Sequence, residues 1–462
     1  MSTDGSGADA PPDPVRRFHH GILVVVVALL LVVAGLTAAN SVQGARLVRA
    51  QVSPDAAVER AGQHLVLQLD QVVDPVPSDA VATLPHLAVV ARTDGSTLDL
   101  QLQTTLAYAT TYQVEVPLVS RATGAASVLR YGFTTPPATL YTLHRAQDSD
   151  DQPDTIERVT AGVTTPQPVR TLPRIQEYAV ADPDIAVVTA DADGLDTLQV
   201  GPLDPAHPSD TVLSGVHLSQ LKASGSAGLF GFVVTTETEG TTSNPVHLLL
   251  YQTGSRTGPL TVTGLGGLPV EVRDWAFVPG TSAVVVQDQN NGMFLLDPVR
   301  GAVPKALGDH LEIHGLGRGA TLVVGDAQNR YTRIDLTTGR TEPLLDLRLG
   351  SGLPRRITPL GERDRFVAVL NRYSAGDLHS SAVTLGPRRR PHLLYTPPAG
   401  ATVEAVCLSP NEQLVAVTAS VETAGSYADD PDPVGSVTTV VDLGTDEHPL
   451  VAPGSAADWC TR

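Results

Sequence analysis

The sequence predicts a chain that is all-β except for one N-terminal transmembrane helix. The prediction rests on one apolar run near the N-terminus, on many short alternating strands joined by turns, and on a repeat of about 40 residues. Glycine (41) and proline (36) are abundant and aromatic residues reach only 4%, as expected when turns join many strands. In chain order we expect a disordered cytoplasmic tail over 1–20, a transmembrane helix over 21–39 and a linker over 40–47. A β-sandwich over 48–136 and a β-propeller over 137–462 follow.

The charge balance argues against a nucleic-acid partner. The chain carries 49 acidic and 31 basic residues, for a formal net charge of −18. Nucleic-acid phosphates are normally met by a concentrated Lys/Arg surface, which such a balance does not favour. We therefore expect no nucleic acid among the partners.

The apolar run over 21–39 contains no charged residue and is just long enough to cross a bilayer core as a helix. Arg16 and Arg17 precede it directly, and a short N-terminal tail before a large C-terminal part is the arrangement of a signal anchor. The sequence therefore predicts a single-pass protein of the cell membrane with a cytoplasmic N-terminus and extracellular C-terminal domains. The small residues Ala38 and Ala39 leave a cleaved signal peptide open as the alternative.

Alternating apolar and polar residues predict half-buried strands in the next part of the chain. The pattern is clear over 63–73, 96–102 and 112–118, and each stretch is bounded by Gly, Pro, Asp or Ser. Short strands at this spacing over 48–136 are typical of a small β-sandwich. Tyr112 and Phe133 are expected to pack in its core.

Four segments of this sandwich resemble the bacterial Ig-like domain of the S-layer SbsA type. They are the opening VSP, the strand end VVDP, the stretch LAYATTYQVEV and the closing GFTTP, at 52–54, 72–75, 106–116 and 132–136. The resemblance implies an Ig-like β-sandwich that acts as a spacer or an adhesion module in a cell-envelope protein.

A repeat occupies the rest of the chain. Each copy has a short apolar strand, a turn rich in Gly, Pro or Asp, and a strongly apolar strand. The copies are at 177–191, 221–235, 274–288, 313–326, 357–370 and 405–418. A period of about 40 residues with further strands between the copies is typical of propeller blades.

Two of these segments, YTRIDLTTG at 331–339 and CLSPNEQLVAV at 407–417, resemble WD40-like and TolB-type β-propellers. The C-terminal stretch 456–460 has the pattern of a lone innermost strand and echoes 274–277. If it completes the first blade, the ring closes without a free sheet edge. Seven blades are therefore favoured, and six or eight stay open.

The repeat places Cys407 and Cys460 at equivalent positions of innermost strands in neighbouring blades. We predict a disulfide between them that closes the ring. For a loop of about 50 residues the chain-entropy model gives roughly 4 kcal/mol of stabilisation. Two buried free thiols are the alternative, because a disulfide requires closely spaced Cα atoms.

The sequence shows no signature of catalysis. It contains no G-x-S-x-G, H-E-x-x-H or C-x-x-C motif, so we predict no catalytic, cofactor-binding or metal-binding residues and no enzyme activity. The acidic loops 148–154 and 191–196 offer oxygen ligands of the kind that calcium takes, but neither has the spacing of an EF-hand, and solvated turns are favoured.

The sequence thus predicts a non-catalytic binding or scaffold protein of the cell envelope, in which an Ig-like spacer presents a propeller. The high Arg, Ala and Val content, with lysine only at Lys222 and Lys305, is typical of an actinobacterial-type protein. The expected partner is an envelope protein or a cell-wall polymer, in addition to the membrane. A propeller-based glycan hydrolase or lyase, and a fixed subunit of an envelope assembly or secretion complex, stay open. A channel lined by small apolar residues would argue against the hydrolase, and a cluster of acidic residues and histidines would favour it.

Overall fold

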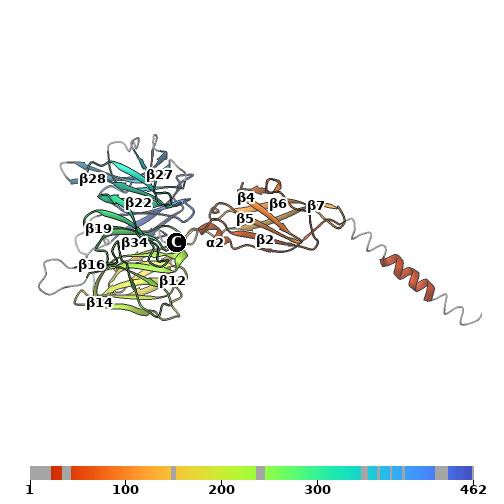
Figure 1. The fold of residues 1–462 in the computed structure, drawn as a ribbon, viewed down its shortest axis with the longest axis horizontal. Helices are drawn as coiled ribbons and strands as arrows, with labels where there is room; N and C mark the ends of the chain where they lie inside the picture. Colours follow the sequence, from red (N-terminus) through yellow and green to blue (C-terminus); the bar gives the residue numbers. More distant parts are fainter. Residues whose placement is uncertain are drawn as a thin grey trace, which may run out of the picture. The chain divides into compact units, whose positions relative to one another are not determined.

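The computed structural model describes residues 22–33, 43–146, 152–235, 245–344, 352–361, 365–374, 377–387, 391–421 and 435–459. The chain divides into two compact units, Met1–Pro136 and Pro137–Arg462, which are described separately (Figure 1).

The predicted transmembrane helix is corrected by the structure. Inside the span 21–39 a helix is described over 22–33, and the other residues of the span, like the predicted tail over 1–20, lie outside the described residues. In the part of the chain that the structure describes, no helix is long and apolar enough to span a membrane. The predicted fold class is therefore wrong in this element, and so is the predicted location as a single-pass membrane protein.

The first unit is a sandwich of two antiparallel sheets with strand orders β1-β2-β5-β4 and β3-β6-β7. A short helix, α2 (Pro54–Glu59), and a 3-10 turn, η1 (Ser78–Ala80), connect its strands. The strands are β1 (Leu47–Gln51), β2 (His64–Leu69), β3 (Ala82–Leu84), β4 (Val89–Asp94), β5 (Thr97–Leu102), β6 (Thr111–Val119) and β7 (Ala126–Thr134).

Both sheets of the sandwich contribute to one core. Along β6 the buried residues are Tyr112, Val114, Val116 and Leu118, as the two-residue period of a strand requires. The rings of Tyr112 and Phe133 stack with centroids 5.6 Å apart, and the Tyr112 hydroxyl accepts a hydrogen bond from the backbone N–H of Ala107 at 2.9 Å. The expectation that Tyr112 and Phe133 are core residues is confirmed.

Within the described residues, the strands of the second unit form seven four-stranded antiparallel blades (Figure 1). Blades 2 and 3 share one long strand, β14, whose first half pairs with β13 and whose second half pairs with β15.

The bounds of the strands, blade by blade, are as follows. Blade 1 contains β34 (Ser455–Asp458), β8 (Thr139–His144), β9 (Asp154–Thr160) and β10 (Gln167–Leu172). Blade 2 contains β11 (Ile175–Ala181), β12 (Asp184–Ala190), β13 (Asp196–Pro202) and the start of β14 (Asp210–Ser224). Blade 3 contains the end of β14, the turn η2 (Gly225–Ala227), β15 (Leu229–Thr235), β16 (Val246–Gln252) and β17 (Leu260–Thr261). Blade 4 contains β18 (Val272–Phe277), β19 (Val284–Asp288), β20 (Gly292–Leu296) and β21 (Lys305–Asp309). Blade 5 contains β22 (Glu312–Gly317), β23 (Thr321–Gly325), β24 (Tyr331–Asp335) and β25 (Thr341–Pro343). Blade 6 contains β26 (Leu353–Pro359), β27 (Arg365–Ser374), β28 (Asp377–Pro387) and β29 (His392–Tyr395). Blade 7 contains β30 (Ala401–Leu408), β31 (Leu414–Val421), β32 (Val437–Asp442) and β33 (Leu450–Pro453).

The C-terminal strand closes the ring. β34 pairs antiparallel with β8, so the last strand of the chain is the innermost strand of the first blade. It also contacts the innermost strands of both neighbouring blades, β30 and β11. The propeller fold predicted from the sequence is confirmed, and its blade number agrees with the favoured one.

Buried polar side chains hold neighbouring blades together. Asp154 of blade 1 accepts a hydrogen bond from the backbone N–H of Ile175 in blade 2 at 2.9 Å. Asp196 of blade 2 does the same for the N–H of Leu218 in blade 3 at 2.7 Å. These side chains satisfy backbone groups at the start of the next blade, which would be costly to leave buried without a hydrogen bond.

Candidate functional site

The innermost strands of all seven blades line a central channel with a cavity of about 380 Å³. The lining residues come from β11, the second half of β14, β18, β22, β26, β30 and β34. In the described structure each of these strands pairs on one side only within its own blade. Side chains of neighbouring blades bond some of the backbone groups along the other edges, such as the N–H groups of Val180 and Leu221 and the carbonyl oxygen of Trp275, so only the remaining groups of these edges can serve a ligand in the channel.

Most of the channel wall is apolar. It includes Ala179, Leu221, Ala276, Phe277, Ile313, Leu316, Val406, Leu408 and Trp459. Gly315 and Gly317 allow blades 5 and 6 to approach closely: a Cβ atom on Gly315 would lie 2.6 Å from the carbonyl oxygen of Ile357, and one on Gly317 would clash with the carbonyl oxygen of Pro359. Small and apolar residues thus form the wall that the sequence analysis took as evidence against a glycan hydrolase.

Lys222 is the first of two cations in the wall. Its Nζ lies 3.4 Å from Asp274 Oδ1 and 5.0 Å from the centre of the Trp275 ring, and it donates a hydrogen bond to the Trp275 carbonyl oxygen. Desolvation lowers the pKa of Lys222, and the charge of Asp274 opposes this effect. Its ammonium group is therefore held by blade 4.

Arg356 is the second cation, on β26. Among the residues that the structure describes, its guanidinium makes no hydrogen bond or ion pair. The adjacent Arg355 instead donates to the carbonyl oxygen of Val403 at 3.0 Å and lies 3.9 Å from a carboxylate oxygen of Glu404. Desolvation lowers the pKa of Arg356, with a raising effect from the charge of Asp274, but an arginine stays charged at neutral pH. Arg356 is thus a charged donor on the cavity wall that is exposed to solvent and has no partner among the described residues.

Two carboxylates also line the channel, and both accept backbone hydrogen bonds. Glu412 Oε2 accepts from the N–H of Gly361 at 2.7 Å, and Asp458 Oδ2 accepts from the N–H of Val180 at 2.5 Å. Asp458 is only 7% exposed. With Lys222, Arg356 and Arg318, the channel lining contains three cations and two carboxylates.

The charged residues of the innermost strands occupy one repeated position. In each innermost strand the pairing register shifts once, and in five of the seven the residue directly after the shift is charged. These residues are Glu177, Lys222, Asp274, Arg356 and Asp458. These residues carry no motif that marks them as a site in the sequence, although they occupy the same position in their repeats.

The acidic loops considered for calcium have structural roles where they are described. Asp191 Oδ1 accepts hydrogen bonds from the backbone N–H groups of Asp193 and Leu195, both at 2.9 Å, which is the geometry of a capped turn. Asp154 and Asp196 bind backbone groups of the next blade, and 148–151 lie outside the described residues. Among the described residues, no three His, Cys, Asp or Glu side chains lie close enough together to hold a metal ion.

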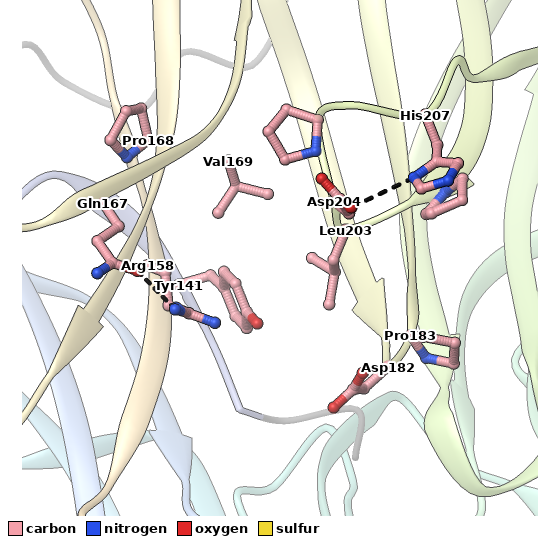
Figure 2. Close-up of a pocket in the computed structure, with 12 residues that line it drawn as sticks. Tyr141, Arg158, Gln167, Pro168, Val169, Asp182, Pro183, Leu203, Asp204 and His207 are labelled. Atoms are coloured by element: carbon pink, nitrogen blue, oxygen red, sulfur yellow. Dashed lines mark hydrogen bonds and ion pairs between the residues drawn. The ribbon is translucent and has the colours of Figure 1, made fainter.

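A second cavity, of about 480 Å³, is a groove between blades 1 and 2 (Figure 2). Its charged side chains interact with near neighbours: Arg158 donates to Gln167 Oε1 at 2.5 Å, and His207 Nδ1 lies 3.3 Å from Asp204 Oδ2. The side chains of His207 and Asp204 are 64% and 60% exposed, so water competes for this pair. The channel is therefore the stronger candidate site.

The predicted disulfide lies at the closure of the ring. Cys407 is buried, and its Sγ accepts a hydrogen bond from the backbone N–H of Trp459 at 3.3 Å. Cys460 follows Trp459 directly but lies outside the described residues. The bond between Cys407 and Cys460 stays a prediction.

Comparisons with known proteins give structural neighbours only. No family model matches the chain, so the resemblance to S-layer Ig-like domains has no support there. No curated protein matches it either. Similar solved structures include the β-propeller domain of the Trilobed protease from Pyrococcus furiosus, with 8% identity, a TM-score of 0.44, and coverage of 77% of this chain and 94% of that one. Another is a putative TolB from Agrobacterium tumefaciens, with 14% identity, a TM-score of 0.36, and coverage of 54% and 86%. A third is an acylaminoacyl peptidase from Pyrococcus horikoshii, with 7% identity, a TM-score of 0.44, and coverage of 76% and 51%. At these identities and scores, the propeller assignment of this chain rests on its own strand order.

Proposed function

We propose that this protein is a binding protein whose propeller channel receives part of a partner molecule. The observation that carries the proposal is the channel itself, which combines a mostly apolar wall with a guanidinium, that of Arg356, that has no partner among the described residues. Ligand sites are typically apolar concavities of about 300–1,000 Å³ with a few well-placed polar groups, and the channel falls in this range.

The arrangement favours binding over glycan hydrolysis. A glycosidase uses two carboxylates that stand free to donate a proton and to attack or activate water. Glu412 and Asp458, the carboxylates of the channel wall, each accept a backbone hydrogen bond from another blade. Of the partner classes expected from the sequence, an envelope protein suits an apolar channel better than a hydroxyl-rich wall polymer.

Site-specific photocrosslinking tests the proposal. A benzophenone amino acid replaces Phe277 in the channel wall of the full-length protein, and in a control protein it replaces Val303, which is 86% exposed on the outer strand region of blade 4. The tagged proteins are irradiated in cells of the producing organism. We expect a discrete crosslinked product from position 277 and none from position 303. Equal products from both positions, or a product only from 303, would contradict a channel site.

A further inference from the structure

We propose that the channel binds the C-terminal carboxylate of a short apolar peptide segment and that Arg356 is the residue that receives it. This inference rests on the proposed function and adds the chemical class of the ligand. It starts from the different states of the two cations in the channel wall.

Lys222 and Arg356 lie in the same wall, but only Lys222 is committed to the protein. Lys222 interacts with Asp274 and with the carbonyl oxygen and ring of Trp275. Arg356 makes no hydrogen bond or ion pair to any described residue. A guanidinium is a planar fork of donors that matches the two oxygens of a carboxylate. An arginine on the wall of a cavity, without an acceptor among the described residues, can therefore receive an oxyanion.

The charges in the channel favour a monoanion. Lys222 is paired with Asp274, and Arg318 has an interaction of its own, whereas Arg356 has no hydrogen bond or ion pair among the described residues. One carboxylate would match the single charge of Arg356. A phosphate monoester, with close to two negative charges at neutral pH, would leave the site negative and would face repulsion from Glu412 and Asp458.

The rest of the wall favours a peptide over a simple aliphatic acid. Side chains such as Leu221, Phe277 and Leu408 offer apolar contacts, and a cavity of about 380 Å³ admits one narrow segment. The innermost strands also have an edge without a partner strand, and the backbone groups of this edge that neighbouring blades do not already bond can take part in binding. Such edges hydrogen-bond to the amides of an extended peptide, which an aliphatic acid lacks.

Tryptophan fluorescence provides a direct binding assay. The chain has two tryptophans; Trp459 lines the channel, and Trp275 stacks under the Lys222 ammonium group. The probe is N-acetyl-leucyl-valyl-phenylalanine with a free carboxyl terminus, titrated into the full-length protein. The C-terminal amide of the same peptide, sodium octanoate and phenyl phosphate are the comparison ligands. We expect saturable binding of the peptide acid and binding at least about tenfold weaker for each comparison ligand, as the loss of one charge-assisted or backbone hydrogen bond implies.

Variants assign the carboxylate to Arg356. We expect Arg356→Gln to weaken the peptide acid by about 10- to 100-fold and to leave the affinity for the amide unchanged. Arg356→Lys keeps the charge but loses the fork, so an intermediate loss is expected. Arg355→Gln is the matched control, because Arg355 bonds Val403 and Glu404 instead of facing the channel, and it should bind like the wild type. Since Arg356 has no bond to lose in the described structure, unfolding temperatures should be unchanged in both Arg356 variants.

The outcomes separate this inference from the proposed function. Equal binding of acid and amide, or an unaffected Arg356→Gln, would overturn the carboxylate assignment even if crosslinking at position 277 identifies a partner. Tighter binding of phenyl phosphate would replace the carboxylate with a phosphate, and octanoate binding as tight as the peptide would refute the role of the strand edges. If crosslinking at position 277 also gives no product, the channel itself is not the binding site.

Discussion

The ion pair between Arg145 and Asp154 gives a quantitative test of how the blades are joined. Both side chains are buried, at 5% and 0% exposure, and Arg145 Nη1 lies 3.6 Å from Asp154 Oδ2. Asp154 also accepts the backbone N–H groups of Ala146 and Ile175, and Arg145 donates to the carbonyl oxygen of Ile175 at 2.5 Å. The first strand of blade 2 is thus hydrogen-bonded to a buried ion pair of blade 1.

The substitution Asp154→Ala removes three interactions at once. Two backbone N–H groups lose their acceptor, at a cost of about 1–3 kcal/mol each if they stay buried, and Arg145 becomes an uncompensated buried charge. Breaking one side of a buried pair typically costs about 3–5 kcal/mol, which is a large part of the roughly 5–15 kcal/mol that stabilises a native protein. The double variant Arg145→Met/Asp154→Ala has no orphaned charge, so it should cost less than the sum of the single variants by about 1–3 kcal/mol.

Urea unfolding followed by tryptophan fluorescence measures these changes. Both tryptophans, Trp275 and Trp459, lie in the unit Pro137–Arg462, so the signal follows the propeller and not the sandwich. The control is His207→Ala, which removes an exposed ion pair and should change the free energy of unfolding by less than about 0.5 kcal/mol. A cost below about 1 kcal/mol for Asp154→Ala, or strict additivity in the double variant, would refute the reasoning.

Three further predictions follow from single positions. Gly315→Ala places a Cβ 2.6 Å from the carbonyl oxygen of Ile357, so we expect a loss of about 1–3 kcal/mol in urea unfolding; a loss within error would show that blades 5 and 6 can separate freely. His314 is 4% exposed and desolvation lowers its pKa, against the charge of Glu312, so the unfolded state binds the proton more readily. The free energy of unfolding should therefore be highest above about pH 6.5 and should decrease as the pH drops toward the folded-state pKa of His314. Urea unfolding at pH 7.5 and 5.5 should show a smaller decrease for His314→Gln than for the wild type. Equal decreases in the two proteins would contradict this origin. For the predicted disulfide, alkylation without reductant should label neither Cys407 nor Cys460, reduction should cost roughly 4 kcal/mol, and labelling of both in unreduced protein would exclude the bond.

The sequence predicts the propeller well because its signals are local. In β23 the residues Leu322, Val323 and Val324 are all buried, and a continuous apolar run of this kind is typical of a strand covered on both faces. The closure is also predictable, because Asp458 and Trp459 repeat the Asp274 and Trp275 pair of blade 4. The transmembrane prediction, made from the apolar composition of 21–39, is wrong by contrast, because no helix of the described residues is long and apolar enough to span a membrane.

The channel site is harder to predict, because it depends on which charged residues find partners. Lys222 and Arg356 occupy equivalent positions, yet Lys222 lies beside Asp274 of the next blade while Arg356 has only Ala405 at the equivalent position of blade 7. In the sequence, neither of the two cations is next to an acidic residue. The order of the blades around the ring places Asp274 beside Lys222 and no carboxylate at the equivalent position beside Arg356.

The local charge of the channel opposes the charge of the whole protein, and this opposition bears on selectivity. A net charge of −18 repels anions at long range, but salt at physiological strength screens exposed charges beyond about 8 Å. Arg356 is exposed to solvent in the channel, but it acts at contact distance, where a bidentate hydrogen bond adds to the attraction between the charges. An anion that cannot enter the channel therefore meets a repulsive surface, whereas a slender apolar chain that ends in a carboxylate gains both burial and a partner for its charge. Shape and charge then select the same ligand, which is why the carboxylate and the apolar segment belong to one prediction.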